Sequence, residues 1–103
     1  MSPGRGRRTC VALSRDQLEW ARDRAGGNVS GFLRSLVDEG LLDWDAVPPD
    51  VTPSREDRAC IVVVLDEGFD LRLRIARSLV GVGSSELFRR CVERRRAIEG
   101  REG

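Results

Sequence analysis

The apolar and polar positions of this 103-residue chain follow one order that occurs twice. In each copy a short alternating run comes first, followed by a helix-opening polar residue, an amphipathic stretch, a glycine-containing break and a second amphipathic stretch. The copies cover residues 8–41 and 58–99. Two copies are too few for a solenoid, which needs about three stacked units. The simplest use of the repeat is therefore a pair related by a pseudo-two-fold axis.

The first run of each copy predicts a strand. Residues 8–13 alternate loosely between two faces, and residues 61–65 are rich in β-branched side chains. A two-stranded ribbon is unstable alone, and an unpaired 61–65 strand would expose an apolar edge. We therefore expect the two strands to pair antiparallel within one chain. Their core face would consist of Thr9, Val11, Leu13, Ile61, Val63 and Leu65.

Two helices are predicted to follow each strand. Ser14 and Gln17 have the spacing of a capping box, and Asp66 stands in the place of Ser14 in the second copy. Apolar residues at helical spacing predict helices over 15–25, 30–41, 67–80 and 85–98. The openings of the later helices offer two caps each, Asn28 or Ser30 and Ser84 or Ser85.

Two segments belong to neither copy. Residues 1–7 form a basic arm with too little apolar surface to fold. Residues 42–57 contain three prolines, which forbid a continuous helix and mark a linker. Each copy alone would be marginally stable at this length, so both should share one core. The expected fold is one mainly α domain with a two-stranded antiparallel β-ribbon.

Composition excludes several kinds of site. All 18 basic residues are arginine, and His and Tyr are absent, which removes the usual acid-base and nucleophile-activating groups. We expect no enzymatic activity, no catalytic residues and no cofactor. Cys10, Cys60 and Cys91 come singly, without zinc-ribbon spacing, so we expect no metal site. No signal peptide or membrane span is apparent, which favours a soluble, cytoplasmic protein.

The charge is unevenly placed although the formal net charge is only +1. Residues 72–103 hold nine arginines against four glutamates, whereas residues 38–57 hold seven acids and one arginine. Two basic regions are therefore separated by an acidic linker. The run Arg94–Arg96 is either a patch for nucleic acid or a helix end that complements the dipole. Trp20 and Trp44 are expected to cover the core.

The short strand, capped helix, glycine-containing break and a helix that opens Ser-x-x-x-Arg resemble the ribbon-helix-helix family of DNA-binding proteins. The two openings are Ser30–Arg34 and Ser85–Arg89. In that family two chains pair their strands into a ribbon that enters the major groove, while the N-termini of the second helices grip phosphates. The resemblance covers about residues 8–41 and 58–95. This chain departs from the family by supplying both halves, so the resemblance implies a tandem ribbon-helix-helix pseudo-dimer.

The resemblance also implies two groups of contacts with double-stranded DNA. The outer ribbon face would read bases through Arg8, Cys10, Ala12, Arg58, Cys60 and Val62. The basic arm and the helix openings would meet phosphates through Arg5, Arg7, Ser30, Gly31, Ser84 and Ser85. Only Arg8 and Arg58 on the outer face can form the bidentate bonds that direct base reading mainly uses. The other side chains could contact thymine methyls.

Two functions stay open on this pattern. One is a sequence-specific DNA-binding protein, a transcriptional repressor or a plasmid- or virus-type regulator, which could self-associate on adjacent sites. The other is a protein-interaction module, antitoxin-like or a viral inhibitor, which would use Val62, Val64 and the acidic linker to contact a protein. Cys10 and Cys60 near the ribbon centre permit a redox switch, although two small residues in a reduced cytosol is the simpler interpretation.

Overall fold

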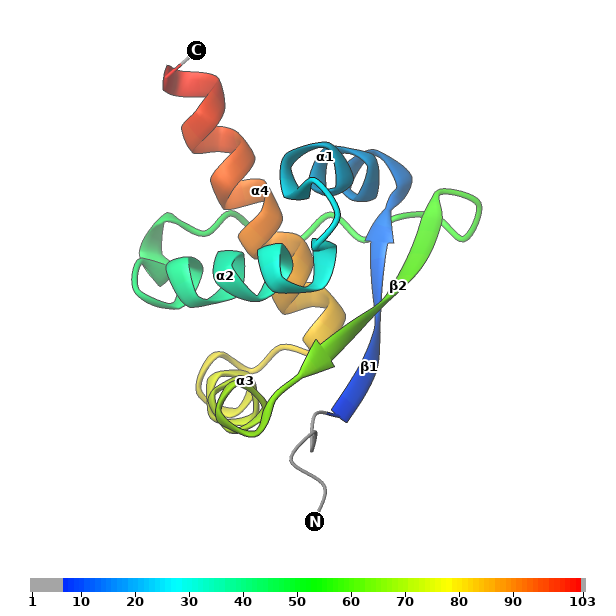
Figure 1. Ribbon diagram of the computed structural model, residues 1–103. Coiled ribbons are helices and arrows are strands. Elements are labelled where there is room, and N and C mark those ends of the chain that lie inside the picture. Colours follow the sequence, from blue (N-terminus) through cyan, green and yellow to red (C-terminus); the bar gives the residue numbers. More distant parts are fainter. Residues whose placement is uncertain (1–6, 103) are drawn as a thin grey trace.

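The computed structural model describes residues 7–102, which form one ribbon and four α-helices (Figure 1). The elements are β1 (Arg7–Ser14), α1 (Arg15–Ala25), α2 (Val29–Leu41), the short 3-10 helix η1 (Trp44–Ala46), β2 (Arg58–Leu65), α3 (Glu67–Val80) and α4 (Ser84–Glu102). The four predicted helices are confirmed to within one residue, except that α4 continues for another turn beyond residue 98.

The two strands pair antiparallel within the chain, as the sequence predicts. Cys10 lies opposite Val62, and Ala12 lies opposite Cys60. The helices gather on one side of this ribbon (Figure 1). Four of the six predicted core-face residues are fully buried there, and Thr9 and Ile61 are half-buried. The buried four are Val11, Leu13, Val63 and Leu65.

Both copies contribute to one hydrophobic core, because the inner ribbon face and all four α-helices meet there. The largest buried side chains include Leu33 and Leu36 of α2, Phe69 of α3 and Phe88 of α4. Cys91 is also buried in this core. Trp20 and Trp44 pack against its margin, where arginine side chains lie over their rings.

The helix caps follow the local sequence. Ser14 and Gln17 form the complete capping box of α1, and the Asp66 carboxylate accepts from the Phe69 amide at the start of α3. Asn28 is the N-cap of α2, accepting from the Gly31 amide. Of the two predicted caps, Asn28 is therefore confirmed and Ser30 is wrong. Its hydroxyl has a different partner, on the ribbon.

The acidic linker folds back against α4, where two of its carboxylates pair with arginines of that helix. Asp43 lies 3.1 Å from Arg94, and Asp50 lies 2.9 Å from Arg89. The run Arg94–Arg96 makes ion pairs with Glu39, Asp43, Asp16, Glu93 and Glu99. These arginines hold the two copies and the linker together, and their charges are compensated within the protein. Within residues 7–102 no helix combines the length and apolar character needed to cross a membrane.

Candidate nucleic-acid interface

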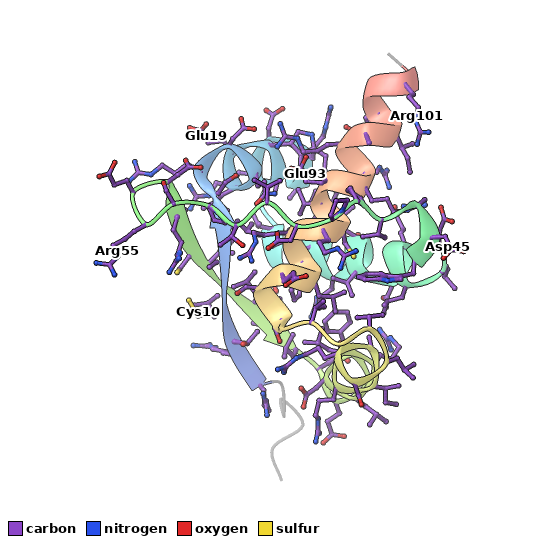
Figure 2. All side chains as sticks on the ribbon, turned by 180° about the vertical axis from the view of Figure 1, so that it is seen from behind. Cys10, Glu19, Asp45, Arg55, Glu93 and Arg101 are labelled. Atoms are coloured by element: carbon purple, nitrogen blue, oxygen red, sulfur yellow. The ribbon has the colours of Figure 1, made fainter. Side chains whose placement is uncertain are left out.

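The outer face of the ribbon is the one large surface of the strands that no helix covers (Figure 1). Alternation along the strands puts four opposed pairs on it: Arg8 with Val64, Cys10 with Val62, Ala12 with Cys60, and Ser14 with Arg58. Figure 2 shows Cys10 on the side of β1 that is turned away from the helices. Every residue predicted for base reading thus lies on this face, and Val62 at its centre is 54% exposed.

Arg8 and Arg58 stand near opposite ends of the outer face. Six residue positions separate their places along β1, which corresponds to roughly 20 Å of extended strand. Both side chains are exposed, and among residues 7–102 no carboxylate lies within 4.0 Å of either guanidinium. Both positive charges are therefore available to a ligand.

Most other arginines are already compensated by acids. Ten of those between residues 7 and 102 lie within 4.0 Å of a carboxylate: Arg7, Arg24, Arg34, Arg72, Arg74, Arg89, Arg90, Arg94, Arg95 and Arg96. Besides Arg8 and Arg58, the arginines of residues 7–102 that are not among them are Arg55, Arg77, Arg101 and the two of α1, Arg15 and Arg22. These two arginines and Glu19 line an open hollow of about 350 Å³ that reaches Cys60 on the ribbon. Uncompensated positive charge therefore extends from the outer face onto the flank of α1.

The Ser-x-x-x-Arg openings bind the free edges of the ribbon. The Ser30 hydroxyl accepts from the Val64 amide at 2.9 Å, and Arg34 donates to the Val64 carbonyl at 2.8 Å. On the other edge, Ser85 accepts from the Ala12 amide at 2.9 Å and Arg89 donates to the Ala12 carbonyl at 2.8 Å. Each motif satisfies both backbone groups of one edge residue, which would otherwise lack a partner in a two-stranded ribbon.

These contacts change the role expected for the helix openings. The Ser30 and Ser85 hydroxyls are engaged by the ribbon, so they position the starts of α2 and α4 beside it rather than capping a helix or standing ready for a phosphate. The Gly31 amide is likewise occupied, by Asn28. Ser84 is the first residue of α4. Two helix N-termini, with their positive dipole ends, thus flank the ribbon at opposite edges.

Two residues of the predicted basic arm, Arg5 and Arg7, are also expected to contact phosphates. Arg7 belongs to β1 rather than to the arm, and its guanidinium lies 3.8 Å from the Asp70 carboxylate. Its charge is therefore partly compensated. Arg5 lies outside the residues that the structure describes.

Sequence reasoning missed the structural role of Arg34 and Arg89. Arg89 is nearly buried and forms a bidentate pair with Asp50 of the linker, with both N···O distances 2.9 Å. The hydrogen bonds from Arg89 hold the pKa of Asp50 below its usual value. The available signal was the shared spacing of four residues after Ser30 and Ser85, which puts serine and arginine on one side of a helix.

The three cysteines have contrasting surroundings. Cys10 and Cys60 are exposed diagonal neighbours on the outer face, and the hydrogen bond that the Cys10 thiol donates to Cys60 raises the pKa of Cys10. Burial raises the pKa of Cys91 to about 12, which makes it a core residue with little thiolate at neutral pH.

Comparison of the chain with protein-family models, with curated proteins and with solved structures found no match. The major groove of B-form DNA is wide enough to admit a two-stranded β-ribbon, and arginine is the side chain that most often reads its base edges.

Proposed function

We propose that this chain is a tandem ribbon-helix-helix pseudo-dimer that binds double-stranded DNA sequence-specifically and acts as a transcriptional repressor. The observation that carries the proposal is the distribution of uncompensated arginines. Among residues 7–102, Arg8 and Arg58 have no carboxylate within 4.0 Å and stand on the outer ribbon face, whereas the arginines of α4 are largely paired with acids. Function would follow from occupying a DNA site, without any chemical step.

The equivalence of the two copies supports this proposal. Cys10 and Val62 each stand four residues before the N-cap of the following helix, and they lie directly opposite each other. A pseudo-two-fold axis would therefore pass through this pair. The matching contacts of Ser30 with Val64 and of Ser85 with Ala12 obey the same relation. Such an axis would let α2 and α4 approach the two phosphate backbones on either side of the groove.

Binding would combine two kinds of contact. Arg8 and Arg58 would each form a bidentate pair with a base edge, most often guanine, and the apolar centre around Val62 would contact thymine methyls. Arg15, Arg22 and the helix N-termini would meet phosphates, which carry affinity but no sequence information. The face is poor in hydrogen-bonding groups, so one pseudo-dimer would recognise only a short site.

The test compares Arg8→Ala and Arg58→Ala with the matched control Arg101→Ala, which removes an exposed arginine in the last turn of α4, away from the ribbon (Figure 2). A site is first selected from random duplexes, and affinities for it and for random DNA are then measured by fluorescence anisotropy at two salt concentrations. We expect each ribbon substitution to lose about 1 to 3 kcal/mol of discrimination. The control variant should discriminate between the selected site and random DNA as well as the native chain does. Two silent ribbon substitutions would rule out reading through this face.

The exposed apolar centre favours a second candidate, a protein-interaction module of the antitoxin or viral-inhibitor type. Val62 and Val64 are the exposed large hydrophobic residues of the ribbon, and a protein partner could bury both. In this case Val62→Asp would abolish capture of the partner, whereas Arg8→Ala and Arg58→Ala would leave it largely intact because rim charges contribute little to affinity. Absence of DNA binding at low salt would favour this candidate over the repressor.

A further inference from the structure

Helix α3 carries an apolar stripe on its solvent side. Leu71, Ile75 and Leu79 recur every fourth residue and are 55%, 52% and 80% exposed. They are distinct from the buried face of the same helix, which packs Phe69 and Leu73 into the core. Single exposed apolar residues are normal on a soluble protein, but a contiguous row of them indicates an interaction surface.

The fold does not require this stripe, because the corresponding helix of the first copy lacks it. Counted from the N-caps Ser14 and Asp66, the positions of Leu71 and Ile75 correspond to Glu19 and Asp23 of α1. Both of those residues are charged and exposed. The same side of equivalent helices is thus polar in one copy and apolar in the other.

The two helices are also covered differently. The long α4 extends along α1, where Glu99 lies 2.8 Å from Arg24 and Arg96 lies 2.7 Å from Asp16. Helix α2 pairs Asp38 with Arg72 of α3 at 3.1 Å, but it ends at Leu41 and does not continue along α3 as α4 continues along α1. An open, mainly apolar groove of about 340 Å³ remains beside the stripe, lined by Arg72 and by the apolar residues Leu41, Trp44, Ile75, Ala76, Leu79 and Val80. Figure 1 shows α3 at the opposite end of the molecule from the last turns of α4.

We propose that this surface binds a second copy of the chain, with the two α3 helices packed antiparallel. The charges along α3 match that orientation. Acidic Glu67 lies in the first turn and basic Arg77 in the last, and within residues 7–102 neither lies within 4.0 Å of an opposite charge, whereas the buried Asp70 pairs with Arg74 of the same helix. An antiparallel pair brings each acidic end beside the partner's basic end and opposes the two helix dipoles. The same patch serves both subunits, so the contact closes as a two-fold dimer and does not propagate into a filament.

The size of the surface sets the expected strength. A 14-residue helix is about 21 Å long, and a standard stable interface buries about 800 Å² on each partner. The stripe and its groove supply the apolar centre of a contact along this length. We therefore expect a reversible dimer whose population rises with protein concentration. This dimer does not depend on DNA, so it stands or falls separately from the proposed function.

The test gives α3 the residues of α1. Sedimentation velocity over a wide concentration range, without DNA, is compared for the native chain, for the double variant Leu71→Glu with Ile75→Asp, and for Val51→Glu. Val51 is an exposed apolar residue of the linker, so its variant controls for adding an acid in place of an apolar side chain. The native chain and the control should approach twice the monomer mass, and the double variant should associate at least tenfold more weakly with an unchanged circular dichroism spectrum.

Two results would overturn the proposal. One is a native chain that stays monomeric at the highest concentration, and the other is a double variant that dimerises as well as the native chain. If the double variant unfolds, Leu79→Gln provides the decisive measurement, because this side chain is the most exposed of the stripe and its replacement leaves the core intact. Unchanged self-association of a folded Leu79→Gln protein would equally reject α3 as the contact.

Discussion

At the scale of single residues, the pair Arg89–Asp50 is the least exposed ion pair described in residues 7–102. Its side chains are 9% and 11% exposed. Arg89 also donates to the Ala12 carbonyl, so one guanidinium joins α4, the linker and an edge of the ribbon. Charges so little exposed to water must be compensated by each other, since removing one partner leaves the other desolvated.

We expect Asp50→Asn to lower the free energy of unfolding by about 3 kcal/mol, because it leaves the Arg89 charge uncompensated. The matched control is Asp38→Asn, which breaks the exposed pair with Arg72 and should cost less than about 1 kcal/mol. Urea denaturation followed by circular dichroism measures both. Equal losses in the two variants would show that burial of the Arg89 pair has no energetic consequence.

The same pair predicts a contribution to acid sensitivity. Because the pKa of Asp50 is lower in the folded state than in the unfolded chain, its stabilisation is present above the unfolded pKa and is lost as the pH falls through the folded value. The difference in unfolding free energy between the native chain and Asp50→Asn should therefore shrink as the pH is lowered below about 4. A constant difference over that range would contradict this assignment.

At the scale of elements, α2 and α4 approach each other closely at Gly40. A Cβ atom added there would lie 2.5 Å from the sulfur of Cys91, a distance that real Cβ contacts essentially never show. Gly40 is also buried. A glycine at this position therefore allows the two helices of different copies to pack against each other, although glycine weakens a helix interior by roughly 0.5 to 1 kcal/mol relative to alanine.

We expect Gly40→Ala to destabilise the protein by about 1 to 3 kcal/mol through overpacking, despite its better helix propensity. Cys91→Ala removes the obstructing sulfur, so the double variant should lose clearly less than the sum of the two single losses. Thermal or urea unfolding of the four proteins gives this coupling energy. Additive losses would mean that the sulfur of Cys91 does not limit the approach of the helices.

At the scale of the whole molecule, the two copies share one hydrophobic core. The ribbon takes one strand from each, and buried residues of all four α-helices belong to one cluster. We expect a single cooperative unfolding transition, with the same midpoint by tryptophan fluorescence and by far-ultraviolet circular dichroism. Trp20 and Trp44 report on the first copy and the linker, while the helical signal reports on both copies. Two separated midpoints would show that the copies fold independently.

The sequence by itself determined the local elements and the faces of the strands. Caps such as Ser14 and Asp66, and the spacing of apolar residues, act between neighbours a few positions apart, so they can be read from the chain. Alternation with a period of two was sufficient to put Arg8 and Arg58 on the outer face. The pairing of β1 with β2 also followed, because the exposed apolar edge of an unpaired strand needs a partner.

Only the tertiary structure decided which polar groups are engaged and which are free. The hydroxyl of Ser85 meets the amide of Ala12 across 73 positions of sequence, and Arg89 meets Asp50 across 39. No local pattern encodes such partners, since they depend on how the linker and α4 fold back on the ribbon. The same reason explains why the stripe on α3 stays exposed: α2 ends beside it at Leu41, whereas α4 continues along α1.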